Sequence, residues 1–250
     1  MFPSIPMHRE TSDSFEAVIL AGGEGSRLVP FTNTCPKPLI QIVGKPILEY
    51  IVDEVKKCEI EDIAISVRYL KEQIISYIDG RHRCFETDSD TMVESFLDVA
   101  QHCSKDYLLC LSADTLISRE SLSYTIDTHL SSGSDITLTL VPNKQSKKRW
   151  RYETNSDSYL TNIGVSEIEN NNLERAGMVI NRNLVGDISK NLPFDKRAET
   201  YSTGWNLILK MMLDEGKSIY LSQSETPVYN INKKSDLGGA ESFVFKYLKE

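Results

Sequence analysis

Three glycines within four positions interrupt the chain directly after a short apolar run. The run Ala17–Ala21 reads AVILA, and Gly22, Gly23 and Gly25 follow it in the stretch GGEGSR. In open α/β sheets, ligands bind beyond the carboxyl ends of the strands. Glycines at such a position let the backbone approach a ligand closely. The stretch therefore predicts an α/β fold with a binding site at its first loop.

Two familiar glycine loops do not fit this stretch. The dinucleotide-binding pattern G-x-G-x-x-G needs a third glycine where this chain has Leu28, and three prolines between positions 30 and 38 forbid a long helix there. A P-loop needs Gly-Lys-Ser/Thr, whereas Gly25 is followed by Ser26 and Arg27. The interpretation that remains is a loop that binds a nucleotide through backbone amides and a few cations. Arg27 can fork across phosphate oxygens, and Lys37 offers a mobile point charge.

Short apolar runs alternate with segments of helical periodicity, which predicts a mostly parallel sheet with helices on both faces. The predicted strands are Ala17–Ala21, Asp62–Val67, Tyr107–Leu111, Ile136–Val141, Gly177–Ile180 and Ser218–Leu221. The predicted helices are Pro46–Cys58, Glu72–Ile78, Met92–Cys103, Arg119–Leu130 and Thr203–Glu215, the last capped by Ser202 or Thr203 and followed by Gly216. We interpret residues 1–16 as an N-terminal extension, 17–250 as one domain, and 143–172 as exposed hairpins or loops on it.

Composition excludes several classes of protein. The net charge of −8 argues against a broad nucleic-acid surface, and no apolar run is long enough to span a membrane. The five cysteines are odd in number and show no C-x-x-C spacing, which disfavours a disulfide framework or a zinc site. Unpaired thiols are typical of a reducing compartment, so we expect a cytoplasmic protein.

The stretch LAGGEGSRLVPFTNTCPKPLIQIVGKPILEY resembles the signature of the sugar-phosphate nucleotidyltransferases, also called NDP-sugar pyrophosphorylases. Their pattern reads L-A-G-G-x-G-[ST]-R-L-x-P-x-T, then P-K-P-L, then G-K-P-(I/M)-L. Later segments, including DYLLCLSADTLIS, ERAGMVINRN and VYNINKKSDL, are similar as well, so that the resemblance covers roughly residues 17–237. It implies a single-domain Rossmann-like nucleotidyltransferase fold with a mixed, mainly parallel sheet.

The resemblance also implies a reaction and its residues. A nucleoside triphosphate and a sugar 1-phosphate would give an NDP-sugar and pyrophosphate, with Mg²⁺ as cofactor. Arg27 would hold the departing pyrophosphate, Lys37 would stabilise charge at the α-phosphate, and Asp114 would be the principal Mg²⁺ ligand. The bland alternative for Asp114 is a cap for the helix that follows. The nucleotide-binding residues would be Leu20, Ala21, Gly22, Gly23, Gly25, Ser26, Arg27, Asp90 and Thr91.

Three departures from the family pattern keep alternatives open. Asn230 stands where a second metal-binding aspartate is common, and no lysine precedes the sugar-binding Gly177, where Arg175 is the candidate substitute. The base-reading loop ETDSDTMVESF does not follow the usual pattern, so the base stays open. The alternatives are a non-catalytic, nucleotide-sugar-binding regulatory subunit and a cytidylyltransferase acting on phosphocholine or inositol phosphate. A homo-oligomer through residues 143–172 or the C-terminal helix is also left open.

Overall fold

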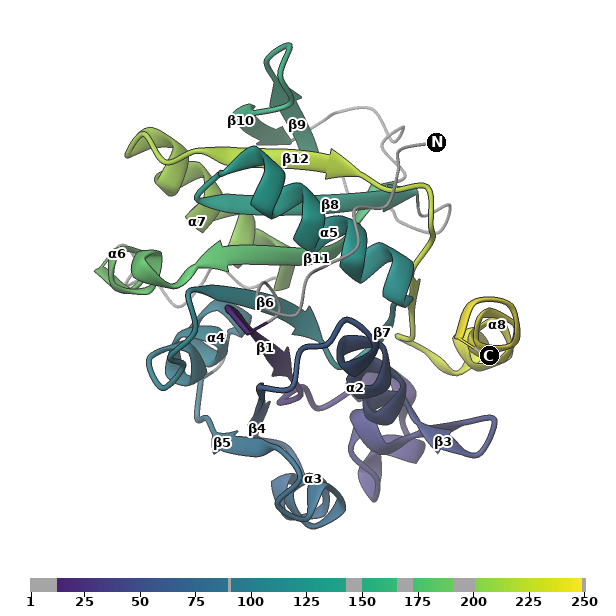
Figure 1. Cartoon of the computed structure of the whole chain (residues 1–250). Helices are drawn as coiled ribbons and strands as arrows, with labels where there is room; N and C mark the ends of the chain where they lie inside the picture. The colour runs from purple at the N-terminus through teal and green to yellow at the C-terminus, as the bar shows by residue number, and fades with distance from the viewer. Residues whose placement is uncertain (1–12, 90, 143–149, 166–172, 191–200, 249–250) are drawn as a thin grey trace.

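A seven-stranded sheet forms the centre of the molecule (Figure 1). The computed structural model describes residues 13–89, 91–142, 150–165, 173–190 and 201–248. The strand order is β12-β8-β11-β6-β1-β4-β5, and only β11 runs antiparallel to its neighbours among these strands. The strands are β1 (Phe15–Leu20), β4 (Ile63–Val67), β5 (Arg83–Glu86), β6 (Tyr107–Ser112), β8 (Ile136–Pro142), β11 (Leu173–Asn181) and β12 (Ile219–Gln223). The prediction of a mixed, mainly parallel sheet is confirmed.

The alternation of side chains along β1 divides the core into two layers. Ala17 and Ile19 belong to the cluster that packs under α2, α5 and α8, whereas Val18 and Leu20 belong to the cluster with α4 and α7. Successive strand residues point to opposite faces, so the apolar run Ala17–Leu20 needs helices on both sides. In Figure 1, α2 and α5 lie in front of the sheet. The helices are α2 (Ile47–Lys57), α3 (Lys71–Ile78), α4 (Met92–Ala100), α5 (Arg119–Ser132), α6 (Val185–Lys190), α7 (Tyr201–Asp214) and α8 (Leu237–Phe243).

Three two-stranded sheets lie outside the central sheet in the described part of the chain. β9 (Trp150–Thr154) and β10 (Leu160–Val165) form an antiparallel hairpin, as expected for part of the 143–172 stretch; the rest of that stretch lies outside the described residues. β2 (Gln41–Ile42) pairs with β3 (Lys45–Pro46). β7 (Thr115–Leu116) pairs with β13 (Tyr229–Asn230), which brings the C-terminal part of the chain to the end of β6.

Several helix and strand boundaries differ from the predicted ones. β1 begins at Phe15 rather than Ala17, so the expected extension 1–16 is two residues too long, and residues 1–12 lie outside the described part. α7 begins at Tyr201, which puts Ser202 and Thr203 inside its first turn instead of at its cap. Gly216, with φ +79°, follows the helix as predicted. The edge strand β5 was not predicted, because its four residues are only partly buried and carry two charges.

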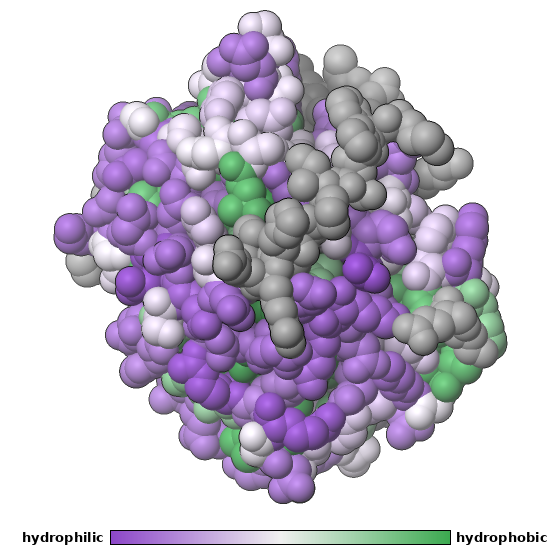
Figure 2. Space-filling model, in the orientation of Figure 1, coloured by the Kyte–Doolittle hydropathy of each residue, from purple (hydrophilic) through white to green (hydrophobic). Residues whose placement is uncertain are grey.

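Figure 2 shows mainly hydrophilic residues on the face seen in Figure 1, with small separate apolar spots. Within the described part of the chain, every helix is too short or too polar to cross a bilayer. All five cysteines are free thiols.

His129 is a buried titratable group on α5, with 2% of its surface exposed. Its Nδ1 lies 2.9 Å from the Thr137 hydroxyl, and its Nε2 lies 2.9 Å from Asn181 Oδ1. Burial lowers the pKa of His129 from 6.5 to about 4, against a weaker opposing effect of the Asn181 hydrogen bond. The imidazole is therefore neutral in the folded protein at neutral pH.

We expect this histidine to make folding stability depend on pH. Below pH 6.5 the unfolded chain takes up a proton at His129, whereas the folded protein does so only near pH 4, so stability falls as pH is lowered through this window. The loss from this group alone is roughly 3 kcal/mol. Urea unfolding at pH 7 and pH 4.5 measures it; H129Q should lose less stability than wild type, whereas H102Q, at an exposed site, should behave like wild type. Equal losses in wild type and H129Q would contradict this.

Candidate functional site

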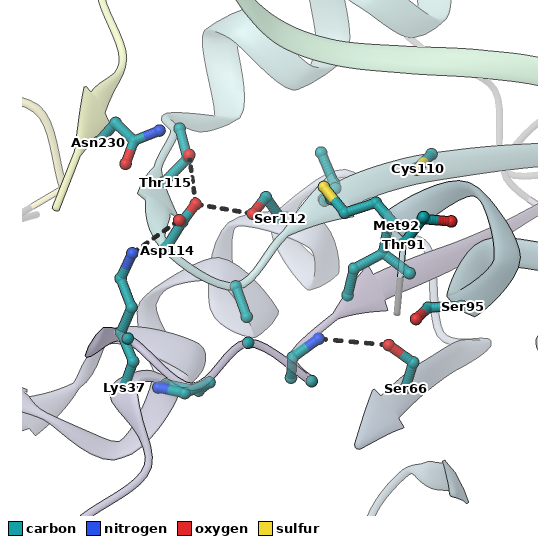
Figure 3. Close-up of a pocket in the computed structure, with 18 of the residues that line it drawn as sticks. Lys37, Ser66, Thr91, Met92, Ser95, Cys110, Ser112, Asp114, Thr115 and Asn230 are labelled. Atoms are coloured by element: carbon teal, nitrogen blue, oxygen red, sulfur yellow. Dashed lines mark hydrogen bonds and ion pairs between the residues drawn. The ribbon is translucent and has the colours of Figure 1, made fainter. Parts of the chain in front are cut away.

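A cleft of about 490 Å³ opens at the carboxyl ends of β1 and β6. The glycine loop after β1 forms one wall, and Gly177 and Arg175 of β11 lie at the other end. Figure 3 shows the side chains that point into it from β6, α4 and β13. Parallel strands that end at one edge, each followed by a loop, give an α/β sheet its binding crevice. The predicted nucleotide and sugar residues that the structure describes therefore share one cavity.

The loop after β1 exposes its backbone to this cleft. Ala21 N donates to the Ser66 carbonyl at 3.0 Å and approaches Ser66 Oγ at 3.4 Å, which fixes the end of the strand on β4 (Figure 3). A Cβ on Gly22 would lie 3.2 Å from Arg68 Cβ, whereas one on Gly23 would meet no atom within 4 Å. Leu20, Ser26 and Arg27 line the cleft as well.

The structure explains why position 25 is a glycine, which the sequence alone did not. Its φ is +65°, a left-handed conformation that side chains disfavour. A Cβ there would lie 2.9 Å from Thr32 Cγ2 and 3.2 Å from Lys37 Cβ. The loop can fold onto the Lys37 stem only because position 25 carries no side chain.

Lys37 and Asp114 form an ion pair inside the cleft. Lys37 Nζ donates to Asp114 Oδ2 at 2.7 Å, with the two side chains 9% and 19% exposed (Figure 3). Asp114 Oδ1 accepts from the hydroxyls of Ser112 at 2.7 Å and Thr115 at 3.0 Å. Burial works against ionisation of Asp114, but the charge and hydrogen bond of Lys37 outweigh it and lower the pKa of the carboxyl. Asp114 is therefore an anion at neutral pH.

The alternative reading of Asp114 as a helix cap is wrong. α5 is capped by Ser118, whose hydroxyl accepts from Ser121 N at 3.5 Å. Asp114 lies four residues earlier, directly after β6, and its carboxylate points into the cleft (Figure 3).

The C-terminal segment around β13 completes this end of the cleft. Asn230 is the register partner of Thr115, and Ile231 N donates to the Asp114 carbonyl at 2.9 Å. Asn232 Oδ1 accepts from Arg27 Nη2 at 2.9 Å and from Lys37 Nζ at 3.4 Å. Sequence reasoning missed Asn232, although it lies two residues after the predicted Asn230 in the quoted stretch VYNINKKSDL.

Arg175 reaches the cleft from the other end. A β-bulge between Arg175 and Gly177 interrupts the register of β11 with β8, and bulges commonly redirect side chains next to functional sites. Its Nη1 is buried and makes no hydrogen bond. The Cys110 side chain that lines the same cleft is buried, and burial raises its pKa to about 12 although the Arg175 charge acts to lower it. A buried donor without a partner is costly and calls for a ligand or water.

The base-side residues are only partly as predicted. Thr91 lines the cleft, but its hydroxyl accepts from Glu94 N at 3.2 Å while its own N donates to Glu94 Oε2 at 3.3 Å, which is a capping box at the start of α4. The Thr91 hydroxyl also donates to Glu94 Oε2 at 3.1 Å. Its hydroxyl is therefore already used in holding the helix. Asp90 lies outside the described residues. Ser66 and Ser95 are additional polar side chains in this wall of the cleft (Figure 3).

The cleft is positively charged although the chain is acidic. Its described lining contains a single acidic side chain, that of Asp114, and four basic ones, those of Arg27, Lys37, Arg68 and Arg175, which give a net charge of +3. The whole chain carries −8. Cations concentrated in a concave site attract anionic ligands and raise their local concentration. The arrangement suits a ligand with several phosphate groups.

The family model described as "Nucleotidyl transferase" matches residues 16–152. The chain is 29% identical over 209 residues to the bifunctional protein GlmU of Methanococcus vannielii, a match that covers 81% of this chain and 48% of that protein. It is 32% identical over 102 residues to the UTP–glucose-1-phosphate uridylyltransferase AglF of Haloferax volcanii, covering 38% of this chain and 42% of that one. The chain spans about half the length of the curated relatives it matches.

A solved structure shares the fold. The inositol-1-phosphate CTP transferase from T. maritima superposes with a TM-score of 0.71 at 17% identity, over 92% of this chain and 95% of that one. At this identity the likeness concerns the fold alone.

Proposed function

Because the chain belongs to the nucleotidyl transferase family, we propose that it transfers a nucleotidyl group from a nucleoside triphosphate to a sugar 1-phosphate. The products are an NDP-sugar and pyrophosphate. The observation that carries the proposal is the buried Lys37–Asp114 pair in a cleft of net positive charge, directly beside the glycine loop. The name of the Haloferax relative, a UTP–glucose-1-phosphate uridylyltransferase, supports a sugar 1-phosphate as acceptor.

The reaction needs charge neutralisation and alignment rather than a protein nucleophile. An oxygen of the sugar phosphate attacks the α-phosphorus, the bond between that phosphorus and the bridging oxygen to the β-phosphate breaks, and pyrophosphate leaves with the electron pair. Both reactants are anions, so the site lowers the barrier by positioning them and by stabilising developing charge. Lys37 stabilises charge at the α-phosphate, and Arg27 holds the pyrophosphate. The backbone of Gly22 and Gly23 admits the nucleotide.

Mg²⁺ is the cofactor we propose, held by Asp114 and Asn230. One carboxylate and one amide oxygen are hard donors that suit magnesium, which usually keeps waters and substrate phosphates as its other ligands. Asn230 is the register partner of Thr115, next to Asp114, and the described residues contain no group of three or more His, Cys, Asp or Glu placed to hold a metal. The donors fit an ion that arrives with the nucleotide. When bound, it would neutralise phosphate charge.

The phosphate of the acceptor sugar is the ligand we propose for Arg175. The guanidinium has a buried Nη1 without a partner, and it lines the same cleft as Lys37 and Gly177. An arginine can bind a phosphate through two parallel hydrogen bonds. Gly177 would lie next to the sugar ring. We place the protein in the cytoplasm, where nucleoside triphosphates are available and free thiols persist.

Arg175→Met is expected to raise the KM of the sugar 1-phosphate by about 10- to 100-fold, because one charge-assisted hydrogen-bonding partner is lost. The KM of the nucleoside triphosphate should change less than about twofold. Steady-state kinetics with each substrate varied in turn measures both values. Arg151→Met, at a side chain 62% exposed on the β9–β10 hairpin, is the matched control. An equal rise in both KM values would remove Arg175 from the sugar-phosphate end.

A substrate panel tests the proposed function. Each nucleoside triphosphate is incubated with Mg²⁺ and with sugar 1-phosphates, phosphocholine or inositol phosphate, and products are separated by chromatography. Formation of an NDP-sugar from one pair supports the proposal and identifies base and sugar. A cytidylylated alcohol phosphate formed instead would assign the chain to cytidylyl transfer. Nucleotide-sugar binding without any product would indicate a regulatory subunit.

A further inference from the structure

We propose that Asn232 is a positioning residue that bridges Arg27 and Lys37 and fixes both cations for the triphosphate of the nucleotide. This inference rests on the proposed function. Neither the family resemblance nor the related proteins assign a role to this side chain. Its carboxamide oxygen accepts from Arg27 Nη2 at 2.9 Å and from Lys37 Nζ at 3.4 Å, so one neutral group contacts two of the four cations of the cleft.

Arg27 needs a partner to stay aligned with Lys37, which its ion pair with Asp114 already holds. Arg27 lies in a three-residue 3-10 turn on the glycine loop, and its hydrogen bond to Asn232 is exposed to solvent. An arginine side chain loses considerable rotamer freedom when it is fixed, so an unsupported Arg27 would lose that entropy when the nucleotide binds. A bridge formed beforehand removes part of that cost. Asn232 supplies it from a segment more than 190 residues away in the chain.

Asn232 is itself held in a defined turn. The carboxylate of Asp236, 5% exposed, accepts hydrogen bonds from Asn232 N at 2.8 Å and from Lys233 N at 2.9 Å. On the other side, Ile231 is fully buried and donates its N–H to the Asp114 carbonyl at 2.9 Å. The bridging amide therefore stands on a backbone fixed at both neighbours. The same turn links Asp114 to the two cations.

The amide is suited to this task because it carries no charge. Arg27, Lys37 and Asp114 together carry +1, and the Asn232 oxygen orients the cations without changing that sum. A carboxylate at position 232 would accept the same hydrogen bonds but would reduce the sum to zero. It would also repel an incoming phosphate. Asparagine thus combines alignment with preserved attraction for an anion.

Equilibrium titration of N232D with the nucleoside triphosphate of the active pair, in EDTA, tests this assignment. EDTA prevents the new carboxylate from recruiting a metal ion. We expect the Kd of N232D to rise at least about tenfold over wild type, and that of N232A to rise about threefold or more. With Mg²⁺ present, the KM of the triphosphate should rise in both variants and that of the sugar 1-phosphate should stay within about twofold.

N155D is the matched control, because it adds the same charge at an exposed turn. Asn155 Oδ1 accepts from Asp157 N and Tyr159 N, a role that aspartate also fills, so N155D should bind like wild type. If wild type binds the triphosphate and N232D binds it equally well, the assignment of Asn232 is wrong and the proposed function stands. If N232D raised the KM of the triphosphate and of the sugar 1-phosphate equally, Asn232 would have only a structural role, and the assignment would likewise be wrong. If wild type itself neither binds triphosphate nor turns over, the proposed function falls together with this inference.

Discussion

Lys37→Met is expected to lower kcat by about a thousandfold. The ammonium group lies 2.7 Å from Asp114 in a mostly buried position, where a charge acts more strongly than in water. Removing one preorganised donor from a developing oxyanion typically costs a hundred- to a thousandfold in rate, and Lys37 also stabilises the bound phosphates. Methionine is preferred to alanine because the Lys37 stem is buried against Gly25. Pyrophosphate release under saturating substrates measures the change.

The matched control for this prediction is Lys45→Met. Lys45 also pairs with a carboxylate, that of Asp53, but it is about one third exposed and does not line the cleft. Its loss should leave kcat within about twofold of wild type. Because Lys37→Met strands the Asp114 carboxylate, we expect a loss of about 1–3 kcal/mol in the free energy of unfolding, checked by urea denaturation. A folded Lys37→Met protein with kcat within tenfold of wild type would contradict the mechanism.

Asp114→Asn is expected to lower kcat by about a hundredfold or more and to weaken its dependence on Mg²⁺. It removes the acidic side chain that lines the described part of the cleft, and with it the charged donor proposed for the ion. Because Lys37 lowers the pKa of this carboxyl below its ordinary value, Asp114 stays ionised throughout the mildly acidic range. If the activity of the wild type falls on acidification while the pH is still above 5, protonation of Asp114 should therefore not be the cause.

Magnesium titrations of kcat for Asp114→Asn and wild type measure this effect. Asp53→Asn is the control, since Asp53 is a partly exposed carboxylate that pairs with Lys45 outside the cleft. It should keep both kcat and the magnesium midpoint. A wild-type magnesium midpoint in Asp114→Asn would show that Asp114 does not bind the ion.

Much of the fold was predictable because its signals are local. The apolar runs that became β1, β4 and β6 are buried on both faces, and such strands appear in the sequence as continuous apolar stretches. α2 appeared as an apolar stripe behind a proline. β5 was not predicted because an exposed edge strand of four residues shows neither a continuous apolar stretch nor an apolar stripe. The start of α7 was predicted too late in the chain, because Ser202 and Thr203 were expected to cap the helix but lie in its first turn.

The site was predictable where residue type and position suffice, and less so where it depends on contacts distant in sequence. The glycine loop and Asp114 follow strand ends, and Lys37 lies in the same sequence motif as the glycine loop, so local patterns identify all three; the structure brings them into one cleft. The Asn232 bridge joins positions 205 and 195 residues apart, which no local pattern encodes. Arg175 depends on a bulge that redirects it, and a bulge appears only when β11 is paired with β8.

The most direct test of the account is pyrophosphate release by wild type and Lys37→Met, measured side by side with Mg²⁺ on the nucleoside triphosphate and sugar 1-phosphate selected by the panel. We predict release by wild type that requires both substrates, and release about a thousandfold slower by the variant. Release that needs no sugar 1-phosphate, or equal rates for both proteins, would contradict nucleotidyl transfer at the Lys37–Asp114 site.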